Sequence, residues 1–256
     1  MPRKLPAHPH LRAYYSKPPI GRWLYFWFGF LLETLTKRRL ARLVKLRLGK
    51  TPLSPPQGLE KLPATGTFVL AANHFSGWPV IDVIPAILTA ANRQRPDLAD
   101  DYLIIVGRRE PRRSNPPLPA RLSRKVINFA FARWSKNVIR LPLDNRQVSI
   151  KFLREWRTRV QKQPVLVFPE GKARLEFGPV RAGVGRWFSN LDVPVVPVGI
   201  WWHENTWHVR IGPAIEWSSR NELHDFQLGL AIANLLPPEL ATRWQKALNE
   251  WRATHQ

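Results

Sequence analysis

Cysteine is absent from this chain of 256 residues, which excludes disulfides, thiolate zinc sites and a cysteine nucleophile. No period of about 20–50 residues recurs, which argues against a solenoid. Residues 1–19 lack the apolar core of a signal peptide; they are basic and interrupted by prolines, so we expect an extended arm there. Hydrophobic residues still make up 44% of the chain, which is enough for a folded domain with a buried core.

Acidic residues are scarce. Asp and Glu number 18 against 40 Lys and Arg, which gives a net charge of +22. Such a charge attracts nucleic acid, an anionic membrane surface or phosphorylated small molecules, and charge alone does not distinguish these partners. A nucleic-acid-binding protein would account for the charge and for the 12 Trp residues. It would not account for the His and Glu that follow two apolar strands, and no nucleic-acid-binding motif is found, so we expect no nucleic-acid partner.

Long hydrophobic runs are also missing, and the most apolar stretch is 23–32 (WLYFWFGFLL). As a helix it would rise about 1.5 Å per residue, too little to cross a hydrocarbon core of about 30 Å. Cations flank it on both sides and alternate with apolar residues over 37–48, which favours a pair of helices lying on an anionic membrane. The alternative is a core helix packed on the domain, followed by a helix whose cations are simply solvated.

The remainder of the chain alternates between short apolar runs and helical patterns, which is typical of an α/β fold. The apolar runs predict strands at 67–72, 102–107, 138–141, 165–168, 193–200 and 207–211. The helical patterns predict helices near 80–92, 120–134, 146–161, 181–190, 226–236 and 239–252. We therefore expect 1–50 to form a basic arm with membrane-docking helices, and 51–256 to form a single domain. Its central sheet should be mostly parallel and flanked by helices.

The first expected strand runs into Asn73, His74 and Ser76. Open α/β sheets place reactive groups at the carboxyl ends of their strands, and imidazole is a suitable base for an alcohol near neutral pH. A base needs an acceptor to hold its tautomer, and the nearest carboxylate is Asp82, eight residues on. The alternative is a buried histidine whose ring bonds only to backbone.

A second apolar strand, 165–168, runs directly into Pro169, Glu170 and Gly171, with Lys172 and Arg174 close behind. Gly171 would let backbone N–H groups approach a ligand, and the two cations can meet a phosphate. Taken alone, the segment could equally be an ordinary strand exit with solvated charges.

Together these segments resemble the glycerolipid acyltransferase family, which includes the 1-acylglycerol-3-phosphate acyltransferases. Asn73-His74 and Phe168-Pro169-Glu170-Gly171 carry the resemblance, in the right order and about a hundred residues apart. Further segments similar to family strands are 137–146, 193–199 and 210–215. The resemblance implies that 51–256 is the acyltransferase domain.

The sequence departs from the family pattern at two positions. The family has Asp five residues after its His, where this chain has Pro79, and the carboxylate follows at Asp82. We expect Asp82 to orient His74 across an inserted loop, or a backbone carbonyl to do so in its place. The family also has Arg where this chain has Ala173, so Arg174 would make that contact from a shifted position.

The resemblance implies transfer of a fatty acyl group from acyl-CoA or acyl-carrier protein to the hydroxyl of a lysophosphatidic-acid-type lipid. His74 would be the general base, and no cofactor, metal or covalent intermediate is required. The substrate-binding residues would be Asn73, Ser76, Arg146, Glu170, Gly171, Lys172 and Arg174. The enzyme would work in phospholipid synthesis as a peripheral protein on the cytoplasmic face of the membrane. The alternatives are a different lipid or amine acceptor, or an inactive membrane adaptor of the same fold.

Overall fold

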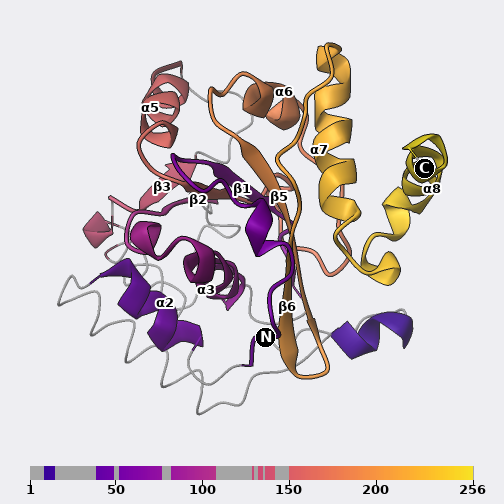
Figure 1. Cartoon of the computed structure of the whole chain (residues 1–256), viewed down its shortest axis with the longest axis horizontal. Helices are drawn as coiled ribbons and strands as arrows, with labels where there is room; N and C mark the ends of the chain where they lie inside the picture. The colour runs from indigo at the N-terminus through magenta and orange to yellow at the C-terminus, as the bar shows by residue number, and fades with distance from the viewer. Residues whose placement is uncertain are drawn as a thin grey trace, which may run out of the picture.

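A six-stranded sheet lies between two layers of helices (Figure 1). The structure is a computed structural model, and it describes residues 9–14, 39–48, 52–76, 82–107, 129, 132–134, 136–141 and 150–255. The strands are β1 (Val69–Ala72), β2 (Leu103–Gly107), β3 (Val138–Leu141), β4 (Val165–Val167), β5 (Val195–His203) and β6 (Thr206–Ile211). The helices are α2 (Leu40–Leu48), α3 (Val83–Gln94), α5 (Ile150–Val160), α6 (Val184–Ser189), α7 (His224–Ala233) and α8 (Gln245–His255).

The strand order is β3-β2-β4-β1-β5-β6, and every neighbouring pair except β5–β6 is parallel. This confirms the expected α/β fold with a mostly parallel sheet. β1 lies between β4 and β5, and all four of its residues are buried. A strand covered on both faces needs apolar side chains on both, which explains the unbroken apolar sequence before Asn73.

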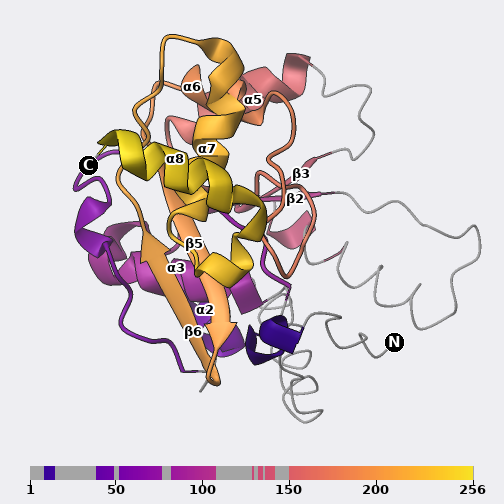
Figure 2. The same ribbon diagram turned by 90° about the vertical axis from the view of Figure 1, so that its right-hand side faces the viewer.

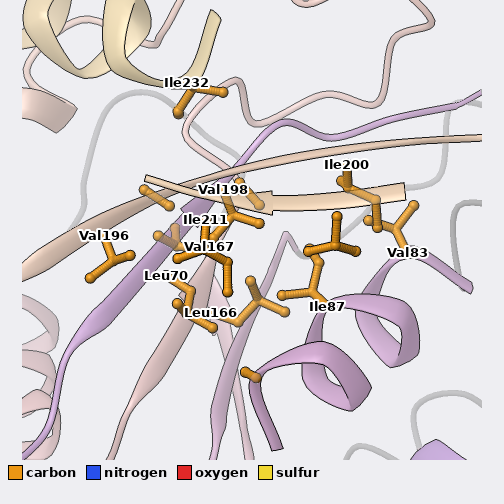
Figure 3. Packing of buried hydrophobic residues seen from close by; sticks show 14 of the residues in the cluster. Leu70, Val83, Ile87, Leu166, Val167, Val196, Val198, Ile200, Ile211 and Ile232 are labelled. Atoms are coloured by element: carbon orange, nitrogen blue, oxygen red, sulfur yellow. The ribbon is translucent and has the colours of Figure 1, made fainter. Parts of the chain in front are cut away.

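Helices cover both faces of the sheet. α3 packs on one face, with α2 outside it, while α5, α6 and α7 cover the other (Figure 1). Figure 3 shows Val83 and Ile87 of α3 directed towards the sheet, where Ile200 of β5 lies beside them. These three side chains are almost fully buried, so the apolar side of α3 fixes its position on the sheet.

α2 contains residues 40–48 of the basic pattern 37–48, and it packs against the domain. Leu40, Val44 and Leu48 are buried, while Arg42 and Lys45 are exposed. The Asp100 carboxylate accepts a 2.9 Å hydrogen bond from the backbone N–H of Ala41, at the first turn. Leu40, Val44 and Leu48 therefore contribute to the core, and Arg42 and Lys45 face solvent. The apolar run 23–32 lies outside the described residues.

The segment expected to be an extended arm contains a short 3-10 helix, Pro9–Tyr14. Leu11 and Tyr14 are buried, and the Tyr14 hydroxyl donates a 3.2 Å hydrogen bond to Glu239. The ring centroids of Tyr14 and His203 are 5.0 Å apart, and His203 pairs with Thr206 at the turn of the β5–β6 hairpin. Figure 2 shows the Pro9–Tyr14 helix near this hairpin. This part of the arm is therefore packed on the domain, because the side chains of Leu11 and Tyr14 are buried there.

Most other expected elements are confirmed within a few residues. β5 is longer than expected, because the apolar run continues through Trp201 and Trp202 into a hairpin. The last expected helix divides into two 3-10 turns, Pro238–Leu240 and Thr242–Trp244, followed by α8. Most of the helix expected at 120–134 lies outside the described residues. Among the helices that the structure describes, none is both long and apolar enough to cross a bilayer.

Candidate active site

The pairing of β1 with β4 brings the two sequence motifs together. These strands are parallel neighbours, and Ala71 lies opposite Val167. Extending this register by three residues puts His74 level with Glu170. A turn at Gly171, where φ is +62°, then separates the two segments before Phe75 pairs with Arg174. The site therefore lies at the carboxyl edge of the sheet, where α/β proteins place their ligands.

Glu170 is bonded to both sides of this site. One carboxylate oxygen accepts a 2.7 Å hydrogen bond from the backbone N–H of His74, and the other a 2.8 Å bond from that of Gly178. The side chain is buried. Burial raises the pKa of Glu170 from 4.5 to about 7, opposed by the backbone donors and by the charge of Arg174. Glu170 therefore joins the segment after β1 to the loop after β4.

The His74 ring stacks on Phe168, with 4.4 Å between ring centroids and 19° between planes. Both backbone polar groups of His74 are hydrogen-bonded. Its N–H donates to Glu170, and its carbonyl accepts a 2.8 Å bond from the N–H of Arg174. The residue is partly exposed. His74 thus has a backbone held by two hydrogen bonds and a ring stacked on Phe168, at a partly exposed position.

Asn73 is buried, and its side-chain amide pairs with the backbone of β5. It donates a 2.9 Å bond to the carbonyl of Ile200 and accepts a 2.7 Å bond from the N–H of Ile200. The amide thereby extends the β1–β5 ladder beyond the last residue of β1. It holds the strand end in place, and a contact between Asn73 and substrate stays a prediction.

The expected partner of His74 lies just before α3. Asp82 is 1% exposed, and residues 77–81, which lead to it, lie outside the described residues. Orientation of His74 by Asp82 therefore stays a prediction. Ser76 is partly buried, and its backbone N–H donates a 2.8 Å bond to the carbonyl of Arg174.

Cations surround the turn at Gly171. Gly171, Lys172 and Arg174 are exposed. A Cβ added at Gly171 would lie 2.6 Å from Cδ of Arg181, so this arginine, which sequence reasoning missed, also borders the turn. Its only sequence signal was its position in the same basic stretch. Arg146, the other expected phosphate ligand, lies outside the described residues.

Arg174 extends along the loop towards Glu170. A Cβ added at Gly178 would lie 2.7 Å from Cδ of Arg174 and 3.2 Å from the Glu170 carboxylate, so the absence of a side chain at Gly178 leaves room for both. Among the residues that the structure describes, no group of three or more His, Asp and Glu side chains is arranged to bind a metal ion. The described part of the site therefore brings an imidazole, that of His74, to the same edge of the sheet as the exposed cations Lys172 and Arg174.

A family model described as Acyltransferase matches residues 56–201, which include both motifs, the strands β1 to β4 and most of β5. The chain belongs to the acyltransferase family. This confirms the resemblance seen in the sequence, and the protein is an acyltransferase.

The fold is similar to that of a solved structure. The crystal structure of the 1-acyl-sn-glycerophosphate acyltransferase PlsC from Thermotoga maritima matches with a TM-score of 0.51 and 19% identity, over 84% of this chain and 94% of that one. Comparison with curated proteins gives no match. The likeness to PlsC extends beyond the family match and shows a similar fold along most of the chain.

Proposed function

We propose that this acyltransferase moves a fatty acyl group from an acyl thioester to the hydroxyl of a lysophosphatidic-acid-type lipid. The observation that carries the proposal is the meeting of His74 and the 170–174 turn at one edge of the sheet. A base for the acceptor hydroxyl and cations for its phosphate then lie on the ends of two neighbouring strands. An acceptor with both groups on one glycerol backbone fits that arrangement.

In the proposed reaction, His74 removes the proton from the acceptor hydroxyl as its oxygen attacks the thioester carbonyl. The resulting tetrahedral intermediate collapses with cleavage of the C–S bond, and the thiolate takes the proton from the imidazolium. The products are an ester and a free thiol, so no further reactant is needed. General base catalysis of this kind contributes about 10²–10⁴ in rate, and positioning of the two substrates supplies more.

Glu170 and Asp82 act on His74 in different ways in this mechanism. Glu170 holds the backbone of His74 through the 2.7 Å bond to its N–H, so it fixes where the ring stands. Asp82, buried at the start of α3, would accept from the ring and hold the tautomer whose other nitrogen is the base. The acceptor phosphate would bind Lys172 and Arg174 beside Gly171, and Arg146 would complete the set.

We further propose that the enzyme works at an anionic membrane surface as a peripheral protein on the cytoplasmic face. Fatty acyl substrates partition into bilayers, and the exposed Arg42 and Lys45 of α2 would each contribute about 1 kcal/mol beside anionic lipid. Changing both to Glu should weaken binding to anionic vesicles. The matched control, Arg154→Glu in α5 together with Lys162→Glu just after this helix, should not weaken it. Duplex DNA at the same salt should bind less tightly than the vesicles, and the reverse order would contradict this part of the proposal.

The function is tested by an acyl-transfer assay with purified protein in mixed micelles. Acyl-CoA and acyl-carrier protein are compared as donors, and lysophosphatidic acid, lysophosphatidylcholine, monoacylglycerol and a lipid amine as acceptors. The proposal predicts the highest kcat/KM with lysophosphatidic acid. Preference for another acceptor would replace the proposed substrate, and no transfer with any pair would favour the inactive adaptor.

A further inference from the structure

The carboxyl-terminal residues, which lie beyond the family match, fold back on the loop that contains Glu170. The backbone N–H of Phe177 donates a 2.7 Å bond to the carbonyl of Leu240. The rings of Phe177 and Trp244 stack with 5.7 Å between centroids. Trp244 is buried, and its indole N–H donates a 3.3 Å bond to the carbonyl of Gly178. The 170–178 loop therefore lies between the end of the sheet and the turns that precede α8.

These contacts form a continuous series that ends at the proposed base. Trp244 bonds to the carbonyl of Gly178, and the N–H of Gly178 bonds to Glu170. The second oxygen of Glu170 bonds to the N–H of His74. Each of these contacts involves a buried group, so water competes little for it.

The position of the indole is itself fixed by α7. A Cβ added at Gly229 would lie 2.0 Å from the outer edge of the Trp244 ring. Only glycine at this position lets the ring pack so closely against α7. Phe226 is also on α7, and the centroid of its ring lies 5.9 Å from that of Trp244. An indole packed this closely presents its N–H in one direction, towards the 170–178 loop.

We infer that Trp244 is a positioning residue for the active site, which holds His74 in place through Gly178 and Glu170. The inference rests on the proposed function, because it takes His74 to be the base. It also gives residues beyond the family match a part in catalysis. A merely structural Trp244 would contribute packing, and loss of its N–H alone would leave the site unchanged.

The test is Trp244→Phe in the full chain, which keeps an aromatic ring against Phe177 and removes the donor. We expect kcat for acyl transfer to fall about tenfold with little change in KM, less than the roughly 100-fold cost of a 1 Å misplacement. In the Glu170→Gln background the same change should have little further effect, because the series is already broken. The matched control is Trp251→Phe in α8, whose ring is 39% exposed and which should keep wild-type kinetics.

A second measurement needs no substrate. Titration of the Glu170 carboxyl by ¹³C NMR, assigned by its loss in Glu170→Gln, follows the loop directly. Burial is the largest cause of the raised pKa of Glu170, and Arg174 is the charged group that opposes it. A loosened loop admits water, so the midpoint in Trp244→Phe should fall towards 4.5, while Trp251→Phe leaves it unchanged.

An unchanged Glu170 titration and an unchanged kcat in Trp244→Phe would overturn the inference. If Trp244→Phe does not fold, benzothienylalanine at position 244 keeps the shape of Trp without its N–H and is judged by the same criteria. If the wild type fails to acylate lysophosphatidic acid, the proposed acceptor is wrong, and the titration still decides whether Trp244 controls the loop.

Discussion

The carboxylate of Glu170 accepts a hydrogen bond from the backbone N–H of His74 at 2.7 Å, across two neighbouring parallel strands. The two residues are 96 positions apart in the chain. The contact is made through the backbone N–H of His74, so Glu170 does not bond to the imidazole ring in this contact. Glu170 is thereby a positioning residue for the proposed base, and its second bond, to Gly178, links that base to the loop beyond Gly171.

Replacing Glu170 by Gln should lower kcat between about 10-fold and about 100-fold. Gln has nearly the same shape, but only one of its two terminal groups can accept a hydrogen bond, so one of the N–H groups of His74 and Gly178 loses its acceptor. The measurement is steady-state acyl transfer by both proteins. Glu176→Gln, in the same loop, is the control and should retain wild-type kcat. Wild-type kcat in Glu170→Gln would show that the contact does not support catalysis.

The raised pKa of Glu170 makes the fold less stable as pH rises from about 4.5 to about 7. In that range Glu170 keeps its proton in the folded chain and has lost it in the unfolded chain. The stabilisation that comes from protonated Glu170 is therefore complete below pH 4.5 and is lost as pH rises through about 7. At about 1.4 kcal/mol per pH unit, the change is roughly 3 kcal/mol. Urea unfolding of wild type and Glu170→Gln at several pH values measures it. The free energies of unfolding should converge or cross as pH rises, and parallel curves would contradict the prediction.

The fold could be predicted from the sequence to a large extent, because strands buried on both faces have distinctive apolar runs. Residues 165–168 and 193–200 are such runs, and they became β4 and β5. The order of the strands could not be predicted. Nothing local in the sequence states that β4 lies beside β1, and that neighbour relationship is what brings His74 to Glu170.

The candidate site could be predicted as a set of residues but not as a set of contacts. The resemblance placed Glu170 among the substrate-binding residues. It did not indicate the bonds to His74 and Gly178, because these partners are backbone groups that no sequence pattern marks. Asn73 was expected near substrate, and its amide is bonded to Ile200, a contact that depends on β5 continuing past the end of β1. Trp244 was missed because tryptophan is frequent in this chain and its indole donor reaches a carbonyl 66 positions away.

Asn73→Ala should lower the free energy of unfolding by about 2–4 kcal/mol, because two hydrogen bonds to Ile200 are lost in a buried place. Urea denaturation measures the change, and Asn249→Ala at an exposed position of α8 should alter stability by less than about 0.5 kcal/mol. If Asn73→Ala keeps wild-type stability and raises only the KM for the acceptor, then Asn73 binds substrate and does not hold the strand end.

Arg174→Ala should raise the KM for lysophosphatidic acid about tenfold, because a charge-assisted hydrogen bond to phosphate contributes about 1.5–3 kcal/mol. Monoacylglycerol, which has no phosphate, should show no such change. Lys162→Ala, exposed just after α5, is the control and should leave both KM values unchanged. An equal loss with both acceptors would mean that Arg174 acts through Glu170, whose pKa its charge lowers, and does not bind phosphate.

The most direct test of the account is the kcat of His74→Ala with an acyl thioester and lysophosphatidic acid. The ring stacks on Phe168 at a partly exposed position, so the variant should fold, as circular dichroism and thermal unfolding can verify. Removal of a general base predicts a fall in kcat of about 10²–10⁴. A folded His74→Ala protein with kcat within a few-fold of wild type would contradict the account.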